Sequence, residues 1–103
     1  MTDGANGKPI QFKVDFSGQV GQKIQQLKTE AIANGKGQEF DRAFDQILRR
    51  LRSNPADFGE LTLRYHKLGL LVHVASVQPL TVEFAYHEKL PFVIIKNVFL
   101  NLP

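Results

Sequence analysis

Residues 61–100 read LTLRYHKLGLLVHVASVQPLTVEFAYHEKLPFVIIKNVFL, and this stretch decides the fold. Apolar and polar residues alternate through most of it, and residues that favour turns interrupt it three times. The pattern predicts four strand-forming runs, at 61–66, 70–77, 80–86 and 92–100, with Lys96 and Asn97 breaking the last. Short turns between the runs favour antiparallel pairing of neighbouring strands.

Two details of this half carry structural meaning. Pro79 cannot donate a hydrogen bond to a neighbouring strand, so Gln78–Pro79 should break or bulge the sheet there. Phe92–Ile95 is apolar at every position, which is typical of a strand covered on both faces. We therefore expect the start of the last run to lie deep in the sheet.

The first half predicts one strand and two helices. Ile10–Phe16 alternates strictly, with its apolar residues on one face. The next apolar residues recur at helical spacing over 18–33, and Asn34–Gly37 is rich in residues that end a helix. The second helix has an apolar stripe from Phe40 to Leu51, acidic residues early and basic residues late, and Asn54–Pro55 stops it.

Composition indicates an ordinary globular protein of one domain. The chain has 103 residues, of which 43% are hydrophobic and 22% charged, and it has no cysteine. Residues 1–9 have little apolar content and are expected to form a disordered tail before a domain spanning 10–103. Because the apolar runs are far shorter than a membrane span, we expect a cytoplasmic protein without membrane contact.

Few residues in the sequence point to chemistry. The three histidines lie at spacings that local metal ligands do not use, so no metal or cofactor is predicted. A basic run at the end of the second helix, with Lys96 from the last strand, is a candidate nucleic-acid contact; its helical members are Arg49, Arg50 and Arg52. The helix dipole also favours cations there, so this run is equally a solvated helix end.

A second basic group lies in the β-rich half. It consists of Arg64, His66 and Lys67, which could hold phosphate if they converge with Lys96. The net charge of +3 permits an anionic partner. The ten aromatic residues are predicted to be core rather than a platform for stacking bases, because most phenylalanines fall on apolar faces.

Two segments carry a resemblance to a known family. They are residues 40–55, FDRAFDQILRRLRSNP, and residues 77–98, VQPLTVEFAYHEKLPFVIIKNV. With the order of elements, they resemble the second helix and the final hairpin of the RelE/ParE superfamily of bacterial toxin–antitoxin modules. The resemblance implies an α+β fold of order β-α-α-β-β-β, in which a helical hairpin packs on a small, mainly antiparallel, twisted sheet.

The resemblance also implies a function, namely a plasmid-stabilisation-type toxin neutralised by a cognate antitoxin. Such a toxin acts as a ribosome-dependent mRNA endonuclease or as a gyrase poison. The family's final hairpin usually opens with a turn whose arginine serves RNA cleavage, whereas this chain has Val77–Thr81 there, without arginine. The remaining candidates for catalysis are Arg64, His66, Lys67, Tyr86 and His87.

Three hypotheses follow. The first is a divergent family member that acts through partner binding and has lost most catalytic residues. The second is an active mRNA endonuclease whose site is rebuilt from the five candidate residues. The third is an unrelated small α+β interaction module, in which Phe92–Ile95 is covered by a partner or by self-association.

Overall fold

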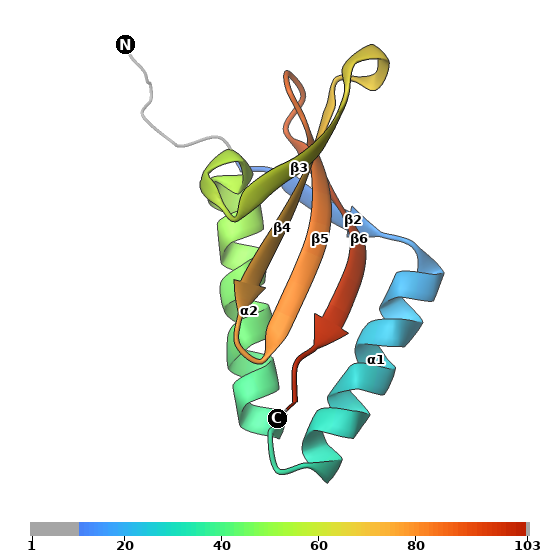
Figure 1. The fold of residues 1–103 in the computed structure, drawn as a ribbon, viewed down its shortest axis with the longest axis vertical. Coiled ribbons are helices and arrows are strands. Elements are labelled where there is room, and N and C mark those ends of the chain that lie inside the picture. The colour runs from blue at the N-terminus through green and yellow to red at the C-terminus, as the bar shows by residue number, and fades with distance from the viewer. Residues whose placement is uncertain (1–10, 103) are drawn as a thin grey trace.

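The computed structural model describes residues 11–102, in which two helices pack on a five-stranded sheet (Figure 1). The helices are α1 (Gly18–Ala33) and α2 (Gly37–Ser53), and short 3-10 turns follow at η1 (Pro55–Asp57) and η2 (His66–Leu68). The strands are β2 (Lys13–Phe16), β3 (Glu60–Tyr65), β4 (Leu70–Val77), β5 (Leu80–His87) and β6 (Phe92–Leu100). The α+β class is confirmed, whereas the tail expected at residues 1–9 lies outside the described residues.

The sheet has the order β2-β6-β5-β4-β3. Strands β3 to β6 form a continuous antiparallel meander, and β2 joins the edge of β6 in parallel. The sheet is therefore mainly antiparallel, as predicted. Four strands follow the helices rather than the three implied by the resemblance, because β3 is a full strand paired with β4.

Local sequence explains where each helix starts and ends. The Ser17 side chain accepts a hydrogen bond from the Val20 backbone N–H at 3.2 Å, which caps the start of α1. Gly35 takes the left-handed conformation, with φ +72°, in the connection to α2. Helix α2 ends at Ser53, and Pro55 then opens η1, as the predicted stop at Asn54–Pro55 requires.

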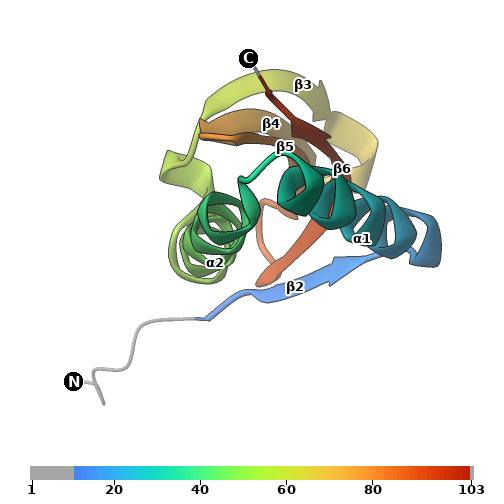
Figure 2. The same ribbon diagram turned by 90° about the horizontal axis from the view of Figure 1, so that it is seen from below.

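Both helices cover the same face of the meander (Figure 2). Helix α2 packs on β2, β4 and β5, and α1 packs on α2 and β6. The core between these layers contains the apolar stripe of α2 and alternate residues of the strands, among them Phe40, Ile47, Leu51, Leu80, Val82, Phe84, Val93, Ile95 and Val98. Burial of this stripe holds the helices on the sheet.

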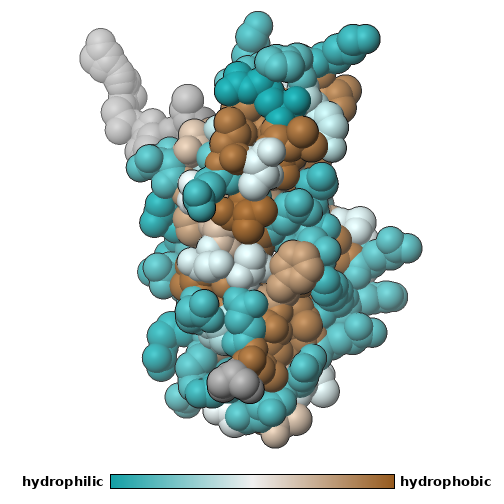
Figure 3. Space-filling model, in the orientation of Figure 1, coloured by the Kyte–Doolittle hydropathy of each residue, from teal (hydrophilic) through white to brown (hydrophobic). Residues whose placement is uncertain are grey.

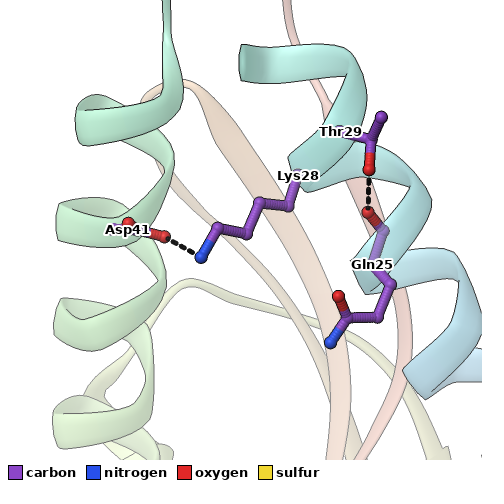
Figure 4. Close-up of polar contacts among 4 residues, drawn as sticks. All are labelled: Gln25, Lys28, Thr29 and Asp41. Carbon is purple, nitrogen blue, oxygen red and sulfur yellow. Dashed lines mark hydrogen bonds and ion pairs between the residues drawn. The ribbon is translucent and has the colours of Figure 1, made fainter.

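The two helices are also joined at the surface. The Lys28 ammonium on α1 lies 3.1 Å from an Asp41 carboxylate oxygen on α2, and the Thr29 hydroxyl donates to the Gln25 carbonyl one turn earlier (Figure 4). Both partners of the ion pair are largely exposed, so its contribution to the free energy of unfolding is at most about 1 kcal/mol. The core fixes the helix pair, and this contact adds little.

Strand β6 differs from its sequence prediction in two ways. It does not break at Lys96 and Asn97: the pairing with β5 shifts register between Glu83 and Phe84, so one extra residue of β6 is accommodated as a bulge. Phe92–Ile95 is not covered on both faces, because Ile94 is 38% exposed while its neighbours Val93 and Ile95 are buried. The helices cover one face of the sheet and leave the other open.

Candidate functional site

Three of the polar residues at one end of the sheet form a cluster on the helix side. Arg64 pairs with Leu71 of β4, which in turn pairs with Tyr86 of β5, so Arg64 and Tyr86 share one cross-strand row. Glu88 follows two residues after Tyr86, and its carboxylate lies 3.9 Å from the Arg64 guanidinium. We call these three side chains the polar cluster.

Tyr86 is the most buried member of the polar cluster, with 9% of its surface exposed. Its hydroxyl has no hydrogen-bond partner among residues 11–102. Burial raises the pKa of the Tyr86 phenol above 10.0; the charge of Arg64 opposes this rise and that of Glu88 adds to it. The phenol therefore stays protonated near neutral pH and is available as a hydrogen-bond donor.

The other predicted catalytic residues are placed differently. His66 and Lys67 lie in η2, at the same end of the sheet, and are exposed. His87 lies one residue beyond Tyr86 and so points to the opposite face of the strand. Its Nδ1 accepts hydrogen bonds from the backbone N–H groups of Lys89 and Leu90, both at 3.0 Å. His87 therefore holds the β5–β6 turn, which explains this residue without a catalytic role.

The arginines at the end of α2 mostly have structural partners. Arg49 forms an ion pair with Asp45 at 2.9 Å, one helical turn earlier. Arg50 donates to the Asp57 carbonyl at 3.0 Å and lies over the Phe58 ring. For Arg52 the described contacts involve its carbonyl, which accepts from the backbone N–H of Phe12. The run therefore ties α2 to η1 and to the start of β2.

Lys96 does not join these arginines. Its ammonium lies 5.7 Å from the centre of the Tyr65 ring. Tyr65 pairs with Leu70, which pairs with His87, and this cross-strand row is next to the row of the polar cluster. Because neighbouring rows point to opposite faces of a sheet, Tyr65 faces away from the helices. Because α2 packs on the helix side, the sheet lies between Lys96 and the arginines.

The helix-free face of β3 to β6, which we call the open face, carries exposed apolar residues. Its large exposed side chains are Leu63, Tyr65, Ile94 and Phe99, between 38% and 47% exposed. Figure 3 shows this face, with apolar side chains along its middle and hydrophilic ones on both flanks. The prediction that the aromatic residues are core is therefore wrong for Tyr65 and Phe99, and it is also wrong for Phe16 of β2.

A buried histidine explains the packing beneath β3. His73 is 5% exposed and its Nδ1 lies 2.9 Å from the Phe58 carbonyl, which can only accept, so Nδ1 carries the proton. The ring lies edge-on to Tyr86, at 5.1 Å between ring centres, and beside Phe84. His73 thus links the polar cluster to the segment that precedes β3. Its position in an apolar strand is the sequence signal that indicates a buried histidine.

Sequence reasoning missed Glu88 and the open face. Glu88 lies in a turn rather than in a patterned strand, and only the register of β3 to β5 brings it beside Arg64. In residues 11–102 no three histidines or acidic residues gather closely enough to hold a metal ion. Neither described helix has the length and apolar character needed to cross a membrane.

Comparison with known proteins adds no relative. The chain matches no family model, and neither curated proteins nor solved structures match it. The polar cluster and the open face are therefore the features from which we infer a function.

Proposed function

We propose that this protein is a divergent RelE/ParE-like toxin-family protein that acts in the bacterial cytoplasm by binding a protein partner through its open face. The observation that carries the proposal is the row Leu63–Val72–Ala85–Ile94, which crosses four strands without a charged residue. Val72 and Ala85 are buried, and the residues at the two ends of the row remain exposed. With Tyr65 and Phe99, these two exposed ends form an apolar surface of the kind that marks interaction sites in soluble proteins.

Two contacts in and beside the polar cluster favour partner binding over catalysis as the function of this protein. Arg64 already has Glu88 as an ion-pair neighbour, so the charge available to a phosphate is reduced. His87, the strand histidine among the predicted catalytic residues, already accepts from two backbone N–H groups. Of the five predicted catalytic residues, only Arg64 and Tyr86 belong to the polar cluster: His66 and Lys67 lie in η2, and His87 holds a turn.

The test is induction of the protein alone in a bacterial host, with growth, translation and DNA synthesis followed together. We expect growth arrest while ribosome-bound mRNA stays intact. The arrest should disappear in a Leu63→Glu/Ile94→Glu variant and persist in Ile32→Glu, which changes an exposed apolar residue of α1. Codon-specific mRNA cleavage would overturn the proposal, and normal growth with soluble protein would remove the toxin assignment.

A second candidate function is cleavage of mRNA by the polar cluster. The supporting observation is that a guanidinium, a phenol and a carboxylate, those of Arg64, Tyr86 and Glu88, lie in one cluster. The Glu88 carboxylate would take the proton of a ribose 2′-hydroxyl, whose oxygen attacks phosphorus; the 5′-oxygen would leave with the proton of Tyr86, giving a 2′,3′-cyclic phosphate. Arg64 would stabilise the charge on phosphorus.

Substitution separates the two candidates. If the polar cluster cleaves mRNA, Glu88→Gln and Tyr86→Phe should each abolish cleavage, and Arg64→Ala with His66→Ala should relieve growth inhibition. Unchanged growth inhibition in the Arg64→Ala/His66→Ala variant would show that this site is wrongly assigned.

A further inference from the structure

We infer that the partner of the open face is an acidic amphipathic protein segment, whose apolar side chains cover Leu63 and Ile94 and whose carboxylates pair with Lys96 and Lys23. This inference rests on the proposed function and names the chemistry of its partner. It stands on the position of these two lysines, on the charges between them and on the state of the neighbouring sheet edge.

The two lysines lie beside the two exposed aromatic rings of the open face. The Lys96 ammonium is 5.7 Å from the centre of the Tyr65 ring, and the Lys23 ammonium of α1 is 4.5 Å from that of Phe99. Lys23 also donates to the side-chain oxygen of Asn97. Tyr65 pairs with Leu70 and Phe99 pairs with Thr81, so the two rings lie on opposite sides of the row Leu63–Val72–Ala85–Ile94.

Neither cation has a carboxylate partner in the described structure. The ion pairs of residues 11–102 use other basic residues, namely Lys28, Lys36, Arg49 and Arg64. A ring face attracts an ammonium by up to about 1 kcal/mol at an exposed site, without neutralising its charge. Lys23 and Lys96 are thus held in place and remain free to pair with anions of a partner.

The charges between the lysines favour a protein segment over a nucleic acid. Glu60 and Glu83 lie on the open face in one cross-strand row with Val74 and Asn97, and they repel any anion placed over this row. The evenly spaced phosphates of a nucleic acid cannot avoid them. The exposed Leu63 and Ile94 are aliphatic and offer no ring on which a base can stack. The two exposed rings, Tyr65 and Phe99, have Lys96 and Lys23 over them, so a stacking base would have to displace a lysine. A peptide can place carboxylates at its two ends and apolar side chains over the middle.

The free edge of β3 is a weaker docking site than the open face. All six residues of β3 are exposed, but its pairing with β4 shifts register between Leu61 and Leu63, so Thr62 is an extra residue. Such bulges protect edge strands against pairing with another chain. Arg64, on the same strand, adds charge at this edge. We therefore place the partner on the face rather than in line with the sheet.

The experiment selects random 16-residue peptides, displayed on phage, against the wild-type protein and measures binding of the enriched peptides by fluorescence anisotropy. We expect peptides with apolar residues between aspartates or glutamates. Lys23→Glu/Lys96→Glu should weaken their binding at least about tenfold, and raising the salt concentration should weaken it as well. Replacing the peptide's acidic residues by lysine should restore binding to this variant.

The control is Lys28→Glu/Lys36→Glu, which changes the net charge equally. Lys28 lies on α1 and Lys36 directly precedes α2, and they pair with Asp41 and Glu39. It should bind the peptides like wild type. If Leu63→Glu/Ile94→Glu abolishes binding and the Lys23→Glu/Lys96→Glu variant binds normally, the partner is not acidic; the inference fails while the proposed binding face stands. If neither variant changes binding, both fail.

Two further probes test the alternative occupants. A labelled 12-nucleotide oligouridine should not bind; binding that both double variants abolish would identify a nucleic-acid surface and overturn the inference. Sedimentation equilibrium should give a monomer. A dimer that Leu63→Glu/Ile94→Glu dissociates would instead identify a second copy of the chain as the occupant.

Discussion

Gly59→Ala should destabilise this protein more than an ordinary glycine substitution in a turn. Gly59 has φ +73°, in the left-handed region. A Cβ atom added there would overlap the Val74 carbonyl oxygen and would lie 2.6 Å from the Ala75 Cβ. The chain therefore needs glycine both for its backbone angle and for the close approach of the segment before β3 to β4.

The substitution Gly35→Ala is a matched control, because it has the cost of the backbone angle without the overlap. Gly35 has φ +72°, but nothing lies within 4 Å of its added Cβ. The left-handed conformation costs an L-residue about 1–2 kcal/mol in both variants. The overlap in Gly59→Ala adds about 1–3 kcal/mol, as other overpacked sites do. We expect losses in the free energy of unfolding of about 2–5 kcal/mol for Gly59→Ala and about 1–2 kcal/mol for Gly35→Ala.

Urea unfolding followed by far-ultraviolet circular dichroism measures both losses. In thermal unfolding, each kcal/mol should lower the Tm by about 4–8 °C for a domain of this size. Equal losses for the two variants would refute the reasoning, because the contact with β4 would then have no cost. The result bears on function, since Gly59 directly precedes β3 and so sets the position of Arg64 and Leu63.

Three further predictions test local contacts. Because the pKa of Tyr86 is raised, wild type should keep its full stability below pH 10 and lose part of it as the pH rises above 10, more than Tyr86→Phe does; urea unfolding at pH 9 and pH 10.5 checks this. His87→Phe removes an acceptor for two backbone N–H groups and should lower the free energy of unfolding by about 1–3 kcal/mol, with partial rescue in His87→Asn. Equal stability of the phenylalanine and asparagine variants would contradict this role. Ser17→Ala removes the cap of α1 and should lower the free energy of unfolding by about 1 kcal/mol. Circular dichroism should show less helix and a lower midpoint of urea unfolding. An unchanged midpoint would mean that solvent replaces the cap.

Local patterns predicted the elements because each pattern has a local cause. The helix over 18–33 and the strand over 70–77 agree with α1 and β4 at both ends. The stop at Asn54–Pro55 agrees with the end of α2 because proline lacks the N–H that helix continuation needs. The apolar run Phe92–Ile95 misled, since periodicity alone does not show whether a second layer covers the other face.

The candidate site was less predictable than the fold. Arg64 and Tyr86 were named from sequence, but their shared row depends on the register of two hairpins. Glu88 was missed because a turn residue has no pattern that indicates its neighbours. Lys96 was grouped with the arginines of α2, whereas the sheet separates them, because sequence does not tell which face a residue beside a bulge takes.

The sequence by itself determined the class of this protein, the order of its elements and the stripes that form its core, because 3.6-residue and two-residue periodicities act within one segment. Tertiary structure alone decided which sheet face stays open, which charges meet and which lysines remain without carboxylates. These properties depend on strand register and on where the helices lie. A shift of one residue would exchange the two faces of a strand without changing its sequence.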